Sequence, residues 1–91
     1  MRFDWDDSKS QGLKTQRGYF LEEVTDLFAS HYVERMKRDD PQQFIAIGYL
    51  RNTLISVIYE ERYDEEREYI WLVTYWKSTR RERDIYEQYL H

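Results

Sequence analysis

The 91-residue sequence predicts a single α+β domain, and three observations lead to this prediction. Apolar residues recur at helical spacing near both ends of the chain. The middle of the chain holds consecutive segments that are apolar or alternating, as strands are, separated by turn-forming residues. Consecutive strands usually pair with their neighbours. We therefore expect residues 1–91 to form one domain, an antiparallel sheet with two N-terminal helices and one C-terminal helix.

The first part of the chain is expected to contain a short strand and two helices. Residues 2–5 (RFDW) are typical of a strand, and Asp6 suits the N-cap of a helix over residues 7–17. Gly18 fits the position just beyond that helix, where a left-handed conformation is common. A second helix is expected over about residues 21–29. Its helically spaced apolar residues are Leu21, Val24, Leu27 and Phe28.

Four strands are expected to follow in the middle of the chain. Residues 31–37 alternate and are typical of an edge strand. Residues 44–50 and 54–59 are apolar on both faces, which indicates a hairpin of central strands. The segment 62–68 (RYDEERE) is a predicted charged turn, and residues 69–76 alternate again. One face of the last strand should pack on the helices.

The last helix, expected over residues 80–90, begins with an unfavourable charge pattern. Thr79 and Glu82 match the capping box, with Thr79 as the N-cap. The helix dipole is positive at this end, so each cation in the first turn costs roughly 0.3–1 kcal/mol. The cations concerned are Arg80, Arg81 and Arg83. This pattern favours an external anion that docks at the start of the helix, although Arg83 also suits a pair with Glu87.

Composition excludes several classes of function. The net charge is −4, which argues against a protein that coats nucleic acid by charge alone. Residues 60–76 carry six acidic and two basic side chains, so the excess is confined to one segment. There is no cysteine, and neither a metal-binding cluster nor a phosphate-binding glycine loop stands out. Without an apolar leader or a membrane-length apolar run, we expect a cytoplasmic protein.

An ordered set of short segments resembles the BrnT toxins of bacterial type II toxin–antitoxin pairs, over nearly the whole chain. The segments are FDWDDSK, LFA, AIGYLRNTLISVIYEER and KSTRRERDIY. The matching residues are Phe3, Trp5, Asp6, Lys9, Gly18, Glu22, Glu23, Gly48, Tyr59, Arg62, Lys77, Thr79, Glu82 and Tyr86.

The resemblance implies a RelE-like α+β fold and the toxin role in a type II pair. It implies a ribonuclease that needs neither metal nor cofactor, cleaves RNA by attack of the 2′-hydroxyl, and inhibits translation. The implied partner is a cognate antitoxin of the ribbon-helix-helix type, which neutralises the toxin. Promoter DNA would be bound only through that antitoxin, and no membrane is involved.

Several positions depart from the family pattern. Gln16 and Arg17 stand where the family usually has Lys-His, and Gln43 stands where it has arginine. Thr74, Tyr75 and Trp76 replace the family's Ser-Ala-Arg. Two alternatives follow. Either the site is rebuilt from other cations, or the chain is a catalytically inactive module that binds its antitoxin and helps regulate transcription.

Four residues are candidates for catalysis, namely Arg62, Lys77, Arg17 and Tyr86. Arginine clamps phosphate bidentately, but Arg62 is also placed to balance nearby glutamates. Lys77 would meet a phosphate at the start of the last helix, or be a solvated lysine. Tyr86, on the apolar side of that helix, suits the core as well as an acid.

The expected RNA contacts are Lys9, Arg80, Arg81 and Trp76. Trp71, Tyr75 and Trp76 suit stacking with unpaired bases, or burial in the core or against an antitoxin. The acidic turn 60–68 is a solvated hairpin end or a docking site for a basic antitoxin segment. The central expectation is one pocket, in which Arg62, Lys77 and Arg80 gather where the last strand meets the last helix.

Overall fold

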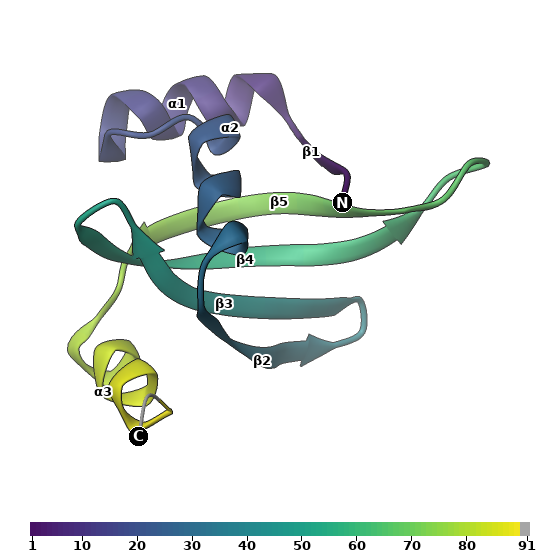
Figure 1. The fold of residues 1–91 in the computed structure, drawn as a ribbon. Coiled ribbons are helices and arrows are strands. Elements are labelled where there is room, and N and C mark those ends of the chain that lie inside the picture. The colour runs from purple at the N-terminus through teal and green to yellow at the C-terminus, as the bar shows by residue number, and fades with distance from the viewer. Residues whose placement is uncertain (90–91) are drawn as a thin grey trace.

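The structure, a computed structural model, describes residues 1–89 and shows a five-stranded mixed sheet with helices on both faces (Figure 1). The strands lie in the order β1-β5-β4-β3-β2. The elements are β1 Phe3–Trp5, α1 Asp7–Arg17, α2 Leu21–Val24, the 3-10 helix η1 Thr25–Ala29, β2 Tyr32–Asp39, β3 Gln42–Leu50, β4 Thr53–Tyr63, β5 Glu68–Lys77 and α3 Arg80–Gln88. The predicted α+β class is confirmed.

The sheet is antiparallel from β2 to β5, but β1 runs parallel to β5. Phe3 lies opposite Ile70, and Trp5 lies opposite Leu72. The prediction of an antiparallel sheet is therefore wrong at β1. That prediction assumed pairing between neighbours in sequence, whereas β1 pairs with β5 across most of the chain. No hairpin turn sets the direction of so distant a pair.

Helix α1 has the predicted bounds because both of its ends are capped. The Asp6 carboxylate accepts a hydrogen bond from the Lys9 N–H at 2.9 Å. Gly18 has φ +102°, and its N–H donates to the Lys14 carbonyl. The helix predicted over 21–29 is instead one α-helical turn, α2, followed by η1. The hydroxyl of Thr25 donates to the Glu22 carbonyl at 2.7 Å, at the point where the helix changes type.

Helix α3 begins as the capping box predicts. The Thr79 hydroxyl accepts from the Glu82 N–H, and the Glu82 carboxylate accepts from the Thr79 N–H. The helix ends at Gln88, and the predicted extension to Leu90 lies outside the described residues. The Glu82 carboxylate also accepts from Ser56 Oγ and Trp76 Nε1, each at 2.9 Å. One glutamate therefore caps the helix and attaches it to β4 and β5.

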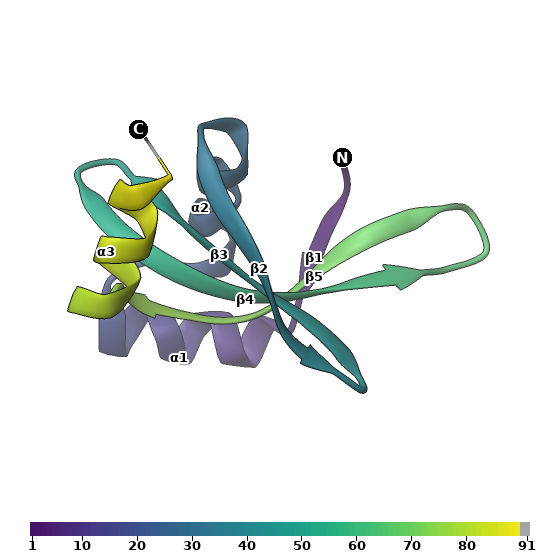
Figure 2. The same ribbon diagram turned by 90° about the horizontal axis from the view of Figure 1, so that it is seen from below.

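The two faces of the sheet bury separate apolar clusters, because α1 and α3 lie on opposite faces (Figure 2). The main core lies under α1, α2 and η1. It contains Leu13, Leu21, Val24, Leu27, Ala46, Leu50, Ile55, Val57, Tyr59, Leu72 and Tyr75. The smaller core under α3 contains Val33, Ile47, Leu54 and Tyr86. Helix α3 thus covers only part of its face of the sheet.

The β4–β5 hairpin extends beyond the pairing with β3 and β1 (Figure 2). The turn predicted over residues 62–68 is shorter, because Arg62 lies within β4 and pairs with Tyr69. Asp64 organises the tip, since its carboxylate accepts from the N–H groups of Glu66 and Arg67 at 2.9 and 3.1 Å. It also forms an ion pair with Arg2.

Candidate functional site

An open groove lies where the end of α1 meets the ends of β4 and β5. Its volume is about 500 Å³, and its lining residues are Arg17, Gly18, Tyr19, Thr53, Ile55, Tyr75 and Lys77. Arg17 is the last residue of α1, and Lys77 is the last residue of β5. Gly18 directly follows Arg17, and its left-handed conformation turns the chain toward α2. Two predicted catalytic cations therefore line one groove, and no carboxylate is among its lining residues.

Arg17 reaches the free edge of β5 beyond the end of β1. Its Nη1 donates to the Tyr75 carbonyl and lies 3.5 Å from the Thr74 hydroxyl oxygen. Both partners are neutral, so they fix the guanidinium without cancelling its charge. Arginine suits this position because its planar guanidinium carries several N–H donors. A single nitrogen, Nη1, makes both contacts.

Tyr75 supports the wall of the groove, and its hydroxyl is not free to act as an acid. Its side chain is buried, with 1% of its surface exposed. The hydroxyl donates to the Tyr19 carbonyl at 2.8 Å and accepts from the Tyr19 N–H at 2.9 Å. Burial raises the pKa of Tyr75, so it stays protonated at neutral pH. The hydroxyl thus ties the segment after Gly18 to β5.

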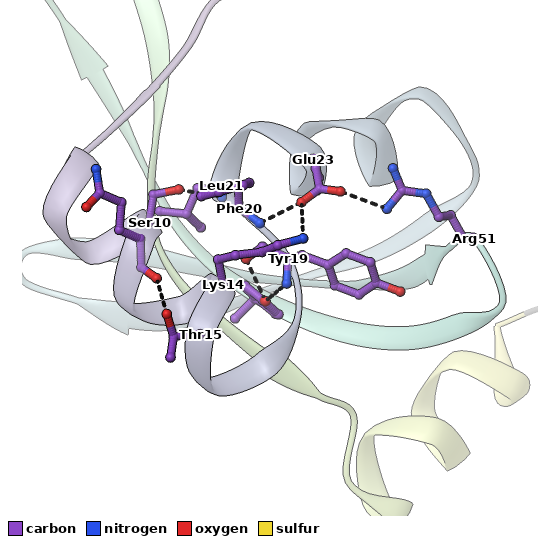
Figure 3. A network of polar contacts seen from close by, with 10 residues as sticks. Ser10, Lys14, Thr15, Tyr19, Phe20, Leu21, Glu23 and Arg51 are labelled. Carbon is purple, nitrogen blue, oxygen red and sulfur yellow. Dashed lines mark hydrogen bonds and ion pairs between the residues drawn. The ribbon is translucent and has the colours of Figure 1, made fainter.

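Glu23 forms ion pairs with two cations, Lys14 and Arg51 (Figure 3). Its carboxylate accepts from the Phe20 N–H at 2.8 Å and lies 3.7 Å from Lys14 Nζ and 3.3 Å from Arg51 Nη1. The Phe20 N–H and then the two cations lower the pKa of Glu23. The Arg51 guanidinium also lies 5.4 Å from the centre of the Tyr19 ring. This network links α1, α2 and the β3–β4 turn.

Arg62 does not belong to this groove. Lys77 lies opposite Ile55, whereas Arg62 lies opposite Tyr69 at the other end of the same ribbon. Eight residues of β5 separate the two positions, which is about 25 Å at 3.3 Å per residue. The expected pocket that joins Arg62, Lys77 and Arg80 is therefore wrong for Arg62. Arg62 does lie near the end of β4, but in an antiparallel hairpin that end faces the start of β5, whereas Lys77 lies at the end of β5.

Arg62 is also neutralised within the chain. Its Nε and Nη2 donate to the same Glu60 carboxylate oxygen at 3.0 and 2.8 Å, and its guanidinium lies 4.4 Å from the Trp71 ring centre. Gln43 donates to the other Glu60 oxygen at 2.6 Å. Gln43 and then Arg62 lower the pKa of Glu60, so the carboxylate remains charged. The prediction that Arg62 balances a nearby glutamate is confirmed by its ion pair with Glu60.

Tyr86 lies in the core under α3, with 6% of its surface exposed. The rings of His31 and Tyr49 contact it edge-on, with centres 6.0 and 5.6 Å away. It lies on the opposite face of the sheet from Arg17, which contacts the α1 side. The core interpretation of Tyr86 therefore holds, and its grouping with Arg17 and Lys77 is wrong.

The predicted RNA contacts fall on different surfaces. Lys9 is exposed on α1, on one face of the sheet. Arg80 and Arg81 are exposed in the first turn of α3, on the other face, three and four residues after Lys77. Trp76 is half-buried on the α3 side, where Lys37 Nζ lies 5.7 Å from its ring centre. Trp76, Arg80 and Arg81 are thus close to Lys77 along the chain, but none of the four predicted RNA contacts is among the lining residues of the groove.

Sequence reasoning missed the structural roles of Tyr19, Glu23 and Tyr75. For Tyr75 the sequence suggested base stacking, an interface or burial in the core; burial is confirmed, but its hydrogen bonds were not predicted because they join segments 56 residues apart. Glu23 carried a usable signal, since it lies three residues after Phe20 at the start of a helix and caps it. Among residues 1–89, no group of three or more acidic, histidine or cysteine side chains is arranged to hold a metal ion.

No family model matches the chain, and no curated protein matches it. Within the described residues, no helix is long and apolar enough to cross a membrane. The function must therefore be argued from the groove itself and from the resemblance of the sequence.

Proposed function

We propose that the chain is the toxin of a type II toxin–antitoxin pair, with a RelE-like domain of the BrnT type, and that it cleaves RNA. The observation that supports this best is the shared groove of Arg17 and Lys77. Two cations line it, while its other lining residues are neutral. An RNA phosphate placed there would meet uncompensated positive charge, which is the main source of affinity for nucleic acid.

The proposed chemistry uses both cations without a metal ion. The 2′-hydroxyl loses its proton to solvent water and attacks the adjacent phosphorus, which makes a phosphorane with additional negative charge. The P–O5′ bond then breaks, which leaves a 2′,3′-cyclic phosphate and a 5′-oxygen that needs a proton. Arg17 is held by neutral partners, and its guanidinium stabilises the phosphorane. The Lys77 ammonium supplies the second positive charge and a proton donor for the leaving oxygen. Arg80 and Arg81 extend the path for the RNA backbone toward α3.

The proposed partner is a ribbon-helix-helix antitoxin that covers the groove and carries the DNA-binding part of the complex. A protein partner would bury the half-exposed aromatic side chains of Trp71 and Trp76, which lie on the partly covered face of the sheet. To exclude RNA from Arg17 and Lys77 as well, the partner would extend around the free edge of β5 to the α1 side of the sheet. Binding of promoter DNA would then depend on the antitoxin, because the toxin itself has a net charge of −4.

A second candidate function is that of an antitoxin-binding module that does not cleave RNA. The pairing of Arg62 with Glu60 and the burial of Tyr86 favour it, because two of the four expected catalytic residues have structural partners. In this alternative the groove contributes only to binding.

Cell-free translation with purified protein distinguishes the two functions. For a ribonuclease we expect arrested synthesis and cleaved RNA in the translation reaction, and cleavage of isolated RNA that a chelator leaves unchanged. Lys77→Ala should slow cleavage by about tenfold or more, since it removes a cation and a proton donor. Lys37→Ala, which removes a lysine on the opposite face, should leave cleavage unchanged. Intact RNA at high protein concentration would instead support the binding module.

A further inference from the structure

Within residues 1–89, strand β2 forms one edge of the sheet and pairs only with β3. From Tyr32, opposite Gly48, to Met36, opposite Phe44, the pairing register is regular. The register shifts between Met36 and Arg38. An edge strand has unpaired N–H and C=O groups along its free side, and a regular stretch of such an edge is a template for another strand. The segment 32–36 is therefore the usable part of this edge.

A groove follows this segment. Its volume is about 510 Å³, and it is lined by residues 31–36 together with Tyr89. The wall is formed by Tyr89, whose hydroxyl accepts from Arg35 Nη2 at 3.2 Å. The guanidinium of Arg35 lies 5.6 Å from the Tyr89 ring centre. Met36 and Tyr89 are 55% and 57% exposed, so the groove offers apolar surface beside the backbone edge.

The charges along this edge differ between the two faces. Successive side chains of a strand point to opposite faces, so Arg35 and Glu34 do not share a face. Arg35 contacts Tyr89 on the α3 side of the sheet. Glu34 lies on the α1 side, where burial and then the charge of Glu61 raise its pKa. A strand that pairs with β2 therefore meets a cation on the α3 side.

A second copy of the chain fits this edge poorly. Two copies paired antiparallel through a two-fold axis place residues of the same face opposite each other. When such a pair is centred on Glu34, Glu34 lies opposite Glu34, and when it is centred on Arg35, Arg35 lies opposite Arg35. Like charges directly opposite each other are destabilising. The occupant should therefore be a different chain, with an acidic residue opposite Arg35.

We propose that the free edge of β2 docks an extended segment of a partner protein, which adds as a sixth strand and places a carboxylate opposite Arg35. Backbone hydrogen bonds along residues 32–36 provide the pairing, and the Arg35 charge selects the segment. The site is separate from the groove of Arg17 and Lys77, because β2 and β5 lie apart in the strand order. Its test is therefore independent of RNA cleavage.

Two capped synthetic peptides test the proposal on the full chain. Thr-Val-Thr-Glu-Thr-Val-Thr reads the same in both directions, so either strand direction places its glutamate opposite Arg35. The second peptide has lysine in place of glutamate. In an NMR titration at millimolar peptide, we expect amide shifts at residues 31–36 and at Tyr89. The glutamate peptide should bind about two- to fivefold more tightly, as cross-strand ion pairs predict.

Variants of the exposed arginines complete the test. Arg35→Glu should reverse the preference for the glutamate peptide over the lysine peptide. Arg35→Gln should abolish this preference, and it keeps the test valid if the reversed charge of Arg35→Glu perturbs folding. Arg38→Glu, beyond the register shift, should keep the preference. Shifts elsewhere in the sheet, no binding of either peptide, or an unchanged preference in Arg35→Glu would overturn the proposal. A wild-type dimer whose interface protects residues 32–36 from hydrogen exchange would also overturn it.

Discussion

An arginine contacts each end of the β4–β5 ribbon, Arg17 near Lys77 and Arg62 near the hairpin turn, but only one end leaves the charge uncompensated. Near Lys77, Arg17 donates to the Tyr75 carbonyl and lies close to the Thr74 hydroxyl, which are both neutral. At the hairpin end, Arg62 donates twice to Glu60 and stacks on Trp71. The partner of an arginine, rather than its presence, therefore decides which end attracts an anion.

The largest expected effect is on RNA cleavage, and it tests the difference between Arg17 and Arg62 directly. Arg17→Ala should reduce RNA cleavage about 100-fold, in the range seen when one donor to a developing charge is removed. Arg62→Ala should change cleavage less than about twofold, because a charge already paired with a carboxylate contributes little to binding at a distance. Cleavage of a labelled RNA under single-turnover conditions measures both. Equal losses in the two variants would contradict the assignment of the site to the Arg17 end.

A smaller effect concerns the support of the groove. Tyr75→Phe should lower the free energy of unfolding by about 1–3 kcal/mol, because the N–H and C=O of Tyr19 would lose their partner in a partly buried site. Tyr63→Phe, in the hairpin end where Tyr63 is 72% exposed, should cost less than about 0.5 kcal/mol. Urea unfolding followed by tryptophan fluorescence gives both values. A loss in Tyr63→Phe as large as that in Tyr75→Phe would refute this difference.

The smallest effect is the dependence of stability on pH. Hydrogen bonds from the Phe20 N–H lower the pKa of Glu23, and Arg2 lowers the pKa of Asp64 to about 2. A lowered pKa stabilises the folded state above the ordinary carboxyl pKa, and this contribution is lost as the pH falls through the folded value. The melting temperature should therefore fall on acidification below about pH 4.5. Because Asp64 and Arg2 are at the surface, their share is small.

Single variants distinguish the contributions of Glu23 and Asp64 to the loss of stability in acid. Glu23→Gln should flatten the upper part of the decline, and Asp64→Asn should flatten the part that approaches pH 2. Each variant should also lower the melting temperature at pH 7, where the carboxylate is charged. A melting temperature that rises as the pH falls from 5 to 2 would show that the sign of these contributions is wrong.

Local patterns in the sequence were sufficient for most of the fold. Asp6 and Gly18 set the ends of α1, and Thr79 with Glu82 set the start of α3, because capping is decided within a few residues. The hairpin strands followed from apolar runs and short turns. The parallel pairing of β1 was not predictable in this way, since its partner lies more than sixty residues away.

The candidate site was less predictable than the fold. The sequence marked Arg17 and Lys77 as cations of interest, but it also marked Arg62 and Tyr86, and it could not separate them. Tyr86 was placed in the core by packing of α3 on the sheet. Arg62 lies outside the groove because antiparallel pairing sets the end of β4 against the start of β5, at the opposite end of the ribbon from Lys77.

The sequence by itself determined the α+β class, the capped helices, the four hairpin strands and the set of available cations, because each depends on residues that are close together in the chain. Only the tertiary structure decided which cations share a groove and which are neutralised. Those outcomes depend on strand register and on partners such as Tyr75 with Tyr19, which are 56 residues apart. Contacts of this kind are fixed by the packing of the whole domain rather than by local propensity.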